Sequence, residues 1–507
     1  MRNNPIIWSD YPDVDVIRVE DTYYAVSTTM HFMPGAVILR SYDLVQWEII
    51  SHVYDSLDNT PAQCLEGEEN IYGKGMWAPS LRYNKGEYFV VFAANDTRKT
   101  YVFRSNDIKG PWKRGYIEGF YHDASLLFDD DGKVYIVYGN KEIYIKELKS
   151  DLSGPKPGGL HRMIIKDEDD IRLGYEGAHI YKINGKYYVF LIHWLSKGSQ
   201  RRVEACYVAD SLEGQFTGGD VLDDDMGYYN AGVAQGGVVD TPDGDWYAIL
   251  FQDHGAIGRI PVLVPMTFEN DFPVLGVDGK VPKYIEVKST RPDHEYAPLY
   301  DGDDFVYSPD QNGQVKLKNV WEWNHTPNDD LWSVTERPGA YRIRTDKISA
   351  NIEQGLNTLT QRLMGPNSQC TVTVDGSELN NGDFAGICVL QGAYGFIALT
   401  REEDKYYLVM VGKDKEEVEH ERIPISTTNG KVTLRLEADF RDNIDIVNFY
   451  YKKDNDWVQL GVTHKLYFRL DHFTGARVGL FLYSTKTPGA CANFIEFEYN
   501  VINHCAS

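Results

Sequence analysis

The stretch "SLLFDDDGKVYIVYG" (residues 125–139) joins a short apolar segment to an aromatic-rich one through an Asp-Gly turn. Apolar alternation on both sides of such a turn is typical of a β-hairpin. The pattern recurs in VIRVEDTYYAVST (16–28), SLRYNKGEYFVVFA (80–93), HIYKINGKYYVFLI (179–192) and GVVDTPDGDWYAILF (237–251). One tyrosine in each second segment marks the repeat, and successive ones lie 64, 47, 53 and 59 residues apart: Tyr24, Tyr88, Tyr135, Tyr188 and Tyr247. The chain therefore contains five copies of one hairpin unit.

A further strand is expected after each hairpin. AVILRSYDLVQWE (36–48) follows the first and TYVFRSNDIKGPWK (100–113) the second, so the same turn recurs after the same strand. Repeats of about 40–65 residues with three or four strands each are typical of propeller blades. Helical periodicity is nearly absent. We predict that residues 1–295 form a five-bladed β-propeller, followed by a linker near residues 281–298.

The pattern changes from residue 299. Short alternating segments recur every 8–15 residues, among them QCTVTVDG (369–376), VTLRLEADF (432–440) and ARVGLFLYS (476–484). LYDGDDFVYS (299–308) is expected to be the first of these strands. This spacing is typical of an antiparallel β-sandwich. We predict an all-β chain whose second domain, residues 299–507, is a sandwich of the concanavalin-like jelly-roll type.

The charge balance limits the kinds of partner. The 507 residues include 51 Lys and Arg against 75 Asp and Glu, which gives a formal net charge of −24. A chain this acidic repels nucleic acid and anionic membranes, so we expect neither as a partner. It suits a neutral ligand. The 35 Tyr and 10 Trp supply faces that could stack on sugar rings, although most are expected in β cores.

Targeting and cysteine signals are weak. No run of 18 apolar residues occurs, and the start MRNNPIIWSD lacks the apolar segment of a signal peptide. We expect a cytoplasmic protein, or a secreted one if a leader has been removed. The six cysteines show no metal-ligand spacing, which favours reduced thiols.

Three carboxylates precede the first strand of a repeat by a few residues: Asp13, Asp123 and Glu176. Equivalent positions on different blades face one another across the tunnel of a propeller. Three acids around one opening repel one another, which favours a functional site. For each aspartate the alternative is turn chemistry, which does not suit a glutamate. Asp10 is expected in a turn, and Asp15 competes with Asp13 as the reactive group of the first repeat.

Five motifs in order extend this interpretation. SDYPDVDVIRVEDTYY, GMWAPSLRY, HDASLLFDDDGKVYIVYG, YEGAHIYKINGKYYVF and GRIPVLVPMTFENDFPVLG resemble glycoside hydrolase family 43. The likeness is to its β-xylosidases and α-L-arabinofuranosidases that carry a C-terminal sandwich, which VWEWNHTPNDDLWSVTERPGAYRIRT and NTLTQRLMGP also resemble. It covers nearly the whole chain.

The resemblance implies an inverting exo-glycosidase. It would release xylose, arabinose or both from the non-reducing ends of xylo-oligosaccharides and arabinoxylan fragments. Asp13 would be the general base, Glu176 the general acid, and Asp123 the group that orients the acid and favours its protonated form. Inversion needs a water between base and sugar, so the two carboxyls should lie roughly 6.5–9.5 Å apart. Many members have Pro-Ser after the base, where this chain has Val14 and Asp15.

The resemblance also implies substrate-binding residues. Arg259 matches an arginine that bonds sugar hydroxyls, and Trp77 matches an aromatic residue of the pocket; the alternatives are a surface ion pair and blade packing. His31 and Phe32 are expected beside the sugar subsites, with packing an equal alternative. The sandwich is expected to lend a loop to one side of the site, which favours exo action.

A calcium ion is a further expectation. Many members have a histidine in the fifth repeat that helps hold a central ion, where this chain has Gln235, which is expected to be a substrate-binding residue. His254 could substitute for it, and Ca²⁺ would suit oxygen ligands and water. A second Ca²⁺ could lie in the acidic turn of Asp301, Asp303 and Asp304, although such turns are usually only solvated.

Two other functions remain open. Retaining fructan hydrolases and transferases also place three acids in a five-bladed tunnel, but one of the acids is a nucleophile. A non-catalytic sugar-binding propeller with a lectin-like sandwich would show the same repeats.

Overall fold

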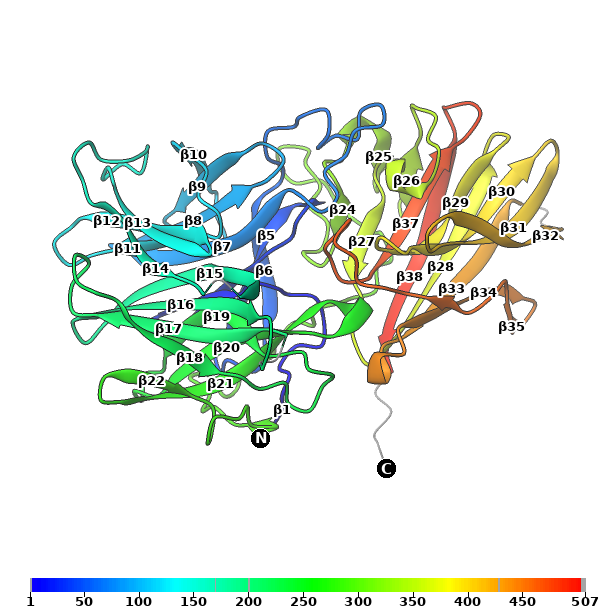
Figure 1. Cartoon of the computed structure of the whole chain (residues 1–507). Coiled ribbons are helices and arrows are strands. Elements are labelled where there is room, and N and C mark those ends of the chain that lie inside the picture. Colours follow the sequence, from blue (N-terminus) through cyan, green and yellow to red (C-terminus); the bar gives the residue numbers. More distant parts are fainter. Residues whose placement is uncertain (1, 169, 199–200, 427–428, 503–507) are drawn as a thin grey trace.

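The protein is all-β and consists of a five-bladed propeller beside a β-sandwich (Figure 1). The computed structural model describes residues 2–168, 170–198, 201–426 and 429–502. Within these ranges the helical elements are four 3₁₀ turns of three residues each, Gly255–Ile257, Asp329–Leu331, Ile352–Gln354 and Arg441–Asn443. The prediction of five blades followed by a sandwich is confirmed.

Each blade is a four-stranded antiparallel sheet whose strands follow the order of the sequence. Blade one contains β2 (Asp15–Val19), β3 (Thr22–Ser27), β5 (Gly35–Ser41) and β6 (Glu48–Tyr54). Blade two contains β7 (Met76–Asn84), β8 (Glu87–Ala94), β9 (Lys99–Ser105) and β10 (Lys113–Ile117). Blade three contains β11 (Ser125–Phe128), β12 (Val134–Asn140), β13 (Glu142–Leu148) and β14 (His161–Lys166). Blade four contains β15 (Ile171–Ile183), β16 (Lys186–Leu195), β17 (Val203–Ala209) and β18 (Thr217–Leu222). Blade five contains β19 (Ala234–Asp240), β20 (Trp246–Asp253), β21 (Arg259–Glu269) and β22 (Phe272–Leu275).

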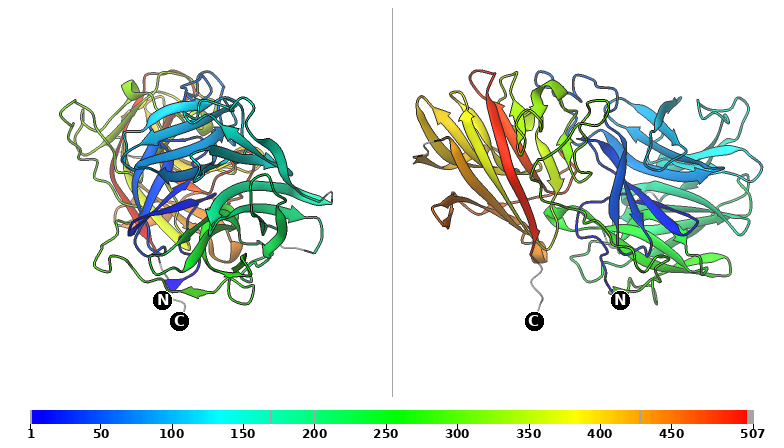
Figure 2. Two further views of the ribbon diagram at one scale, coloured as in Figure 1. Left: turned by 90° about the vertical axis from the view of Figure 1, so that its left-hand side faces the viewer. Right: turned by 180° about the vertical axis from the view of Figure 1, so that it is seen from behind.

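The repeated hairpins of the sequence are the two inner strands of each blade. In blade three, Leu127 pairs with Tyr135, and the Asp129 amide closes the turn on the Lys133 carbonyl at 2.9 Å. Gly132 has a φ of 83°, which a side chain would strain. The innermost strands β2, β7, β11, β15 and β19 are neighbours around the centre, and the view along the propeller in Figure 2 shows this ring.

Apolar side chains fill the space between neighbouring blades. Tyr88 and Tyr54 belong to the core between blades one and two, and Tyr135 and Leu191 to the core between blades three and four. The core between blades five and one continues into the sandwich. Because each blade buries apolar faces against two neighbours, five repeats close into one ring.

The sandwich consists of two large antiparallel sheets, and the prediction of this fold is confirmed. One sheet has the order β32 (Glu417–Ile425), β31 (Lys405–Lys413), β30 (Gly395–Glu402), β29 (Asp383–Leu390), β37 (Arg477–Ser484), β27 (Leu359–Arg362), β24 (Glu322–Asn324) and β4 (Phe32–Met33). The other has the order β25 (Trp332–Ser333), β26 (Tyr341–Arg344), β38 (Cys491–Val501), β28 (Asn367–Glu378), β33 (Lys431–Asp439), β34 (Ile446–Lys453) and β35 (Asp456–Gln459), with β36 (His464–Lys465) also on β34. A separate pair joins β1 (Arg2–Asn3) to β23 (Tyr284–Ile285).

The segment expected to form the first strand of the sandwich is not a strand in the structure. Residues 299–308 form only an isolated bridge from Asp303 to Phe497, so the prediction of a strand there is wrong. Asp303 accepts hydrogen bonds from the Phe305 amide and from Trp321 Nε1, both at 2.8 Å. Such side-chain bonds replace a strand ladder. A calcium ion in this turn stays a prediction.

Several contacts join the two domains. β4 comes from a loop of blade one, yet it pairs with β24 at the edge of a sandwich sheet. Asp10 accepts from the Arg259 amide of the propeller and from the Gly475 amide of the sandwich, both at 2.8 Å. It therefore links two domains, and its prediction as a turn residue is wrong. Figure 2 shows the contact from behind as well.

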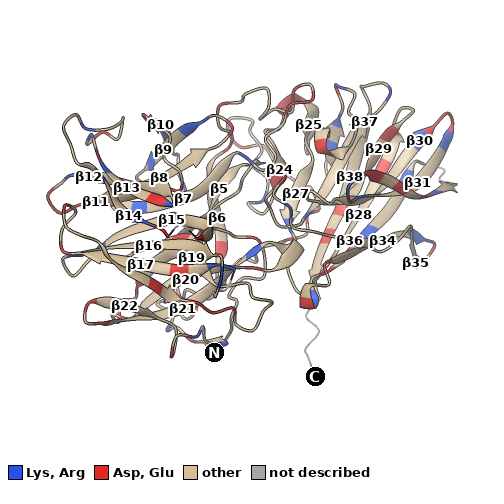
Figure 3. Ribbon diagram, viewed as in Figure 1, with Lys and Arg blue, Asp and Glu red and all other residues tan. Residues whose placement is uncertain are grey.

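Charged residues of both signs are spread over both domains on the face in Figure 3. Within the described residues, no helix has the length and apolar character needed to cross a bilayer. The five described cysteines are free, and Cys505 lies outside the described residues.

Candidate active site

One backbone feature recurs at the inner end of every blade. Two residues before one paired position of each inner strand (Asp15, Ser80, Ser125, His179 and Gly237), the chain takes a positive φ, at Asp13, Ala78, Asp123, Gly177 and Gln235 (φ 54°, 38°, 46°, 61° and 63°). A non-glycine residue at positive φ is strained, and such strain concentrates at functional sites. Asp13 and Asp123 therefore occupy equivalent places on the tunnel mouth.

Glu176 lies one residue before its equivalent place. Gly177 holds that position in blade four, and the register of β15 against β16 shifts on both sides of Glu176. A bulge of this kind redirects a side chain. The expectation that all three acids occupy matching positions is therefore correct for the two aspartates and off by one residue for the glutamate.

Asp13 is bound by two donors. Thr28 Oγ1 donates to Oδ2 at 2.7 Å, and Arg259 Nη1 lies 3.1 and 3.2 Å from the two carboxylate oxygens. The side chain of Asp13 is 7% exposed. Two donors from different segments therefore fix the orientation of the Asp13 carboxylate.

Asp15 is occupied by structural contacts. Its side chain is fully buried, and its oxygens accept from Arg82 Nη1 at 2.6 Å and from the Leu81 amide at 2.7 Å. His179 and the Tyr181 hydroxyl lie at 3.2 Å. Although burial acts in the other direction, Arg82 and His179 hold the pKa of Asp15 well below its usual range. Asp15 therefore ties blades one, two and four together and has no access to a water molecule.

Asp123 and Glu176 lie together beside His122. His122 Nε2 is 3.3 Å from Glu176 Oε2 and 3.6 Å from Asp123 Oδ2. The Gly177 amide donates to Asp123 Oδ2 at 3.1 Å, and Asn140 Nδ2 donates to Glu176 Oε2 at 2.5 Å. We call His122, Asp123 and Glu176 the acid cluster. Burial raises the pKa of Asp123 to about 6 against the opposing effect of His122.

Unpaired donors line the same site. Arg259 is 3% exposed, yet its Nε and Nη2 have no hydrogen-bond partner among the described residues, and neither does the buried Nε1 of Trp77. Buried donors without partners are costly, so their presence points to a ligand that supplies oxygen acceptors. The Asp13 contact leaves the rest of the Arg259 guanidinium free for this purpose.

The sandwich contributes one wall. The Phe473 ring lies 5.6 Å from the Trp77 ring, and the Arg259 guanidinium lies 4.5 Å above Phe473. Phe473 belongs to the segment between β36 and β37 and has a φ of 56°. An aromatic face beside unpaired donors is the kind of surface that sugar rings contact. The expected loop from the second domain thus reaches Trp77 and Arg259.

His31 and Phe32 lie at the domain interface. His31 is fully buried beside the rings of Tyr72 and His325, and neither of its ring nitrogens has a partner. Phe32 pairs with Asn324 of β24, and the Arg477 guanidinium lies 3.5 Å from its ring. The domain interface thus surrounds both residues, and their place beside the sugar subsites stays a prediction.

His254, the residue expected to hold a calcium ion, and Gln235, expected to bind substrate, both have protein neighbours. His254 Nε2 lies 2.7 Å from Gln252 Oε1, and its ring stacks on Tyr228 at 3.8 Å. Burial lowers the pKa of His254 to about 4. The Gln235 side chain packs against Gly177, where a Cβ would lie 2.6 Å from it. His254 is thus bonded to an amide and gathers no carboxylate, and calcium stays a prediction.

Among the described residues, one group of three His, Cys, Asp or Glu side chains has potential metal-ligand atoms within 4.8 Å of one another. It is the acid cluster itself, and the imidazole between two carboxylates accounts for its arrangement without an ion.

Sequence reasoning missed four residues here: His122, Asn140, Arg202 and Phe473. Arg202 Nε donates to Asp253 Oδ2 at 2.9 Å, and its charge acts on Glu176 and Asp13. The position of His122 next to Asp123 was a usable signal. The others reach the site from strand ends and loops that carry no motif.

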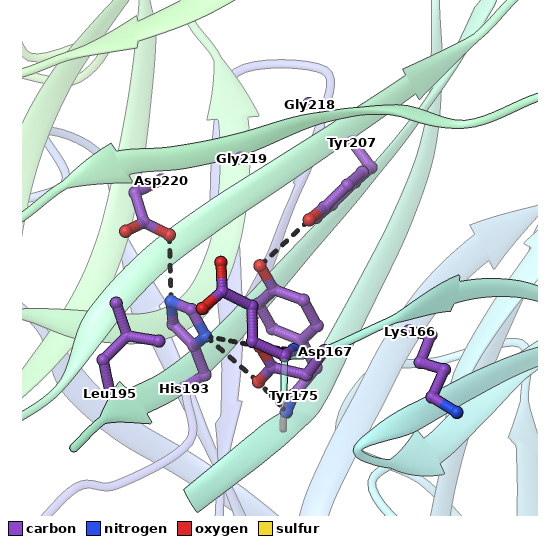
Figure 4. A pocket seen from close by; sticks show the side chains of 10 residues that line it. Lys166, Asp167, Tyr175, His193, Leu195, Tyr207, Gly218, Gly219 and Asp220 are labelled. Carbon is purple, nitrogen blue, oxygen red and sulfur yellow. Dashed lines mark hydrogen bonds and ion pairs between the residues drawn. The ribbon is translucent and has the colours of Figure 1, made fainter. Parts of the chain in front are cut away.

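A separate cavity of about 300 Å³ lies on blade four (Figure 4). His193 bridges Asp167 at 3.0 Å and Asp220 at 2.9 Å, and the Tyr175 and Tyr207 hydroxyls bond each other at 3.0 Å. Asp167 also accepts from the Tyr175 amide at 2.9 Å. The buried polar groups of this cavity satisfy one another, and they fix the backbone immediately before Glu176.

Comparison with known proteins agrees with this geometry. Residues 2–273 match "Glycosyl hydrolases family 43", and residues 310–500 match "Beta xylosidase C-terminal Concanavalin A-like domain". A β-xylosidase of Formosa agariphila is 29% identical over 98% of this chain and 90% of its own. A non-reducing end α-L-arabinofuranosidase of Bacteroides ovatus is 25% identical over 76% of this chain and 73% of its own. The solved structure of a bifunctional GH43-CE protein of Bacteroides eggerthii superposes with a TM-score of 0.90 at 39% identity, over 98% of this chain and 63% of that one.

Proposed function

The chain belongs to glycosyl hydrolase family 43, and we propose that it is an inverting exo-glycosidase that releases xylose, arabinose or both from xylo-oligosaccharides and arabinoxylan fragments. Relatives named β-xylosidase and α-L-arabinofuranosidase support this substrate class. One observation carries the proposal: unpaired donors of Arg259 and Trp77 lie beside Asp13, which Arg259 binds, and beside the acid cluster.

The side chains divide the reaction between them. Asp13, held by Arg259 and Thr28, takes a proton from a water that attacks the anomeric carbon. Glu176 gives a proton to the leaving oxygen at the same time. Asp123 lies beside both Glu176 and His122, and its Oδ2 accepts from the Gly177 amide, which helps to fix the orientation of the acid. When the products leave, Asp13 gives its proton to solvent and Glu176 takes one up from solvent, which restores both groups.

Exo action is supported by the sandwich wall. Phe473 closes the site on the side of Trp77 and Arg259, which leaves less room for a chain that continues in both directions. We expect xylotetraose to lose single xylose units.

The test is hydrolysis of nitrophenyl β-D-xyloside and nitrophenyl α-L-arabinofuranoside, with the first-formed anomer followed by NMR. Inversion predicts that α-xylose appears first from the β-xyloside. First release of β-xylose would mean retention and overturn the mechanism. Turnover of fructan with neither pentoside hydrolysed would favour the alternative substrate class, and sugar binding without turnover would favour a lectin-like role.

A further inference from the structure

His122 occupies an unusual place in the acid cluster. It precedes Asp123 in the sequence, yet its Nε2 is turned to the glutamate of the next blade, 3.3 Å from Glu176 Oε2. Its side chain is 25% exposed, so the ring touches both the acid and solvent. The mechanism above assigns roles to Asp13, Asp123 and Glu176, and it assigns none to the His122 imidazole.

The charges around His122 come from three segments. Asp123 Oδ2 lies at 3.6 Å and Glu176 Oε2 at 3.3 Å, while Arg98, from the turn between β8 and β9, opposes them. The ring of Trp77 lies edge-on at 6.2 Å and carries no charge. Asp123, helped by Glu176, raises the pKa of His122 to about 9 despite burial. The imidazole is therefore a cation at neutral pH, and its Nε2 donates to the carboxyl of Glu176.

This contact distinguishes the two oxygens of the acid. Oε2 of Glu176 already accepts from Asn140 Nδ2 at 2.5 Å, and the imidazolium is a second donor to the same atom. A carboxyl oxygen that accepts two hydrogen bonds is a poor place for its own proton. The proton destined for the leaving group therefore lies on Oε1.

We propose that His122 is a positioning residue for the general acid: its protonated imidazole holds Oε2 of Glu176, leaves the transferable proton on Oε1, and sets the pH above which the enzyme loses activity. The proposal rests on the proposed function, because it assigns a role to a neighbour of the acid. A cation beside Glu176 favours its ionised form, so the imidazolium opposes Asp123 and fixes the alkaline limit of the reaction.

The variant His122→Gln keeps a donor near the position of Nε2 and removes the charge. We expect the alkaline limb of kcat/KM on nitrophenyl pentosides to move up by about one pH unit, with activity at the optimum within about threefold of the wild type. His122→Ala should move the limb in the same direction and also lower kcat about tenfold or more, because orientation is lost. KM should change little in either variant.

A matched control is His161→Gln on β14. This exposed histidine contacts the Tyr138 hydroxyl and no residue of the acid cluster that the structure records. The acidic and alkaline limbs of kcat/KM for this variant should lie at the same pH as in the wild type. In a Glu176→Gln background assayed with a dinitrophenyl leaving group, which needs no proton, the alkaline limb that Glu176 causes should be absent, and adding His122→Gln should leave the pH profile unchanged. An unchanged or lowered alkaline limb in His122→Gln, with the fold verified by circular dichroism, would overturn the proposal.

A second readout does not depend on turnover. NMR titration of the ¹⁵N-labelled His122 ring should show ionisation well above that of a free imidazole, and Glu176→Gln should lower it. If the wild type hydrolyses no pentoside but His122 titrates this way, the proposed function fails while the contact stands. If His122 is neutral at pH 7, the proposal on His122 fails whatever the enzyme hydrolyses.

Discussion

Buried carboxylates occur in two places in this molecule, and the protein treats them in opposite ways. At the domain interface, Glu322 of β24 is fully buried and bound by Arg362 Nη1 at 2.7 Å and Arg477 Nη1 at 2.5 Å, with His52 at 3.1 Å. In the acid cluster, two carboxyls share one histidine. The Glu322 site therefore has more cationic than anionic side chains, whereas the acid cluster has more carboxyls than cations.

The pKa values follow this difference. Although burial acts in the other direction, Arg362 and Arg477 hold the pKa of Glu322 far below its usual range. Burial raises that of Asp123 to about 6. A fully compensated carboxylate has a fixed charge and joins two domains, whereas a poorly compensated one can take up or release a proton near neutral pH. Neutralising each carboxylate in turn therefore tests whether stability and activity have separate sources.

The largest effect is expected from Asp13→Asn. An amide has no basic lone pair for the water proton, so kcat/KM should fall by about 10²–10⁴-fold. The midpoint of urea unfolding should fall less than in Glu322→Gln, because Asp13 pairs with one buried guanidinium and Glu322 with two, and Thr28 still has an acceptor. Activity is measured on both nitrophenyl pentosides. Asp15→Asn is the comparison, and we expect it to lose stability first. If Asp15→Asn lost activity at normal stability and Asp13→Asn kept its activity, Asp15 would be the general base and Asp13 the structural residue.

The next largest effect is on stability. Glu322→Gln leaves Arg362 and Arg477 buried without a counter-charge, and we expect about 3–5 kcal/mol less free energy of unfolding in urea. Because the folded pKa is depressed, the wild-type contribution is present above about pH 4.5 and is lost as the pH falls below it. Asp243→Asn is the control, because its pair with Lys288 is exposed and should matter little. Equal losses in the two variants would contradict the comparison.

The sequence predicted the elements that local chemistry specifies. Turns with Gly or Asp and the apolar alternation around them located the five hairpins, and carboxylates beside them located Asp13, Asp123 and Glu176. The shift of Glu176 by one residue was not foreseeable, because a bulge depends on how β15 pairs with β16. Contacts across hundreds of residues were also missed, such as Arg477 on Phe32 and Phe473 on Trp77. No local pattern records which side chains meet when two domains dock.

Phe473→Ala tests the region where the two sites meet. Removing the ring takes away the wall beside Trp77 and the face under Arg259, and we expect about a tenfold fall in kcat/KM, mostly through KM. Products from xylotetraose, followed by chromatography, should then include xylobiose released directly. The control Phe468→Ala changes a neighbouring ring of the same loop, 5.8 Å from Phe473. If both variants keep wild-type kinetics, the sandwich contributes stability only.

The smallest effect, and the one that sharpens the comparison most, is the stability of Asp123→Asn. Because burial raises the folded pKa to about 6 from 3.8, the folded state keeps a proton that the unfolded chain has already lost. Wild-type stability should therefore fall as the pH rises from about 4 to 6, the reverse of the behaviour from Glu322. Asp123→Asn should flatten this fall and leave the free energy of unfolding at pH 7 within about 1 kcal/mol, since the amide needs no counter-charge although His122 loses its strongest partner. Thermal unfolding of the wild type, Asp123→Asn and Glu322→Gln across pH 4–7 measures this pH dependence of stability. A destabilisation of Asp123→Asn as large as that of Glu322→Gln would mean that the acid cluster also stabilises the fold, and the separation of the two sites would not hold.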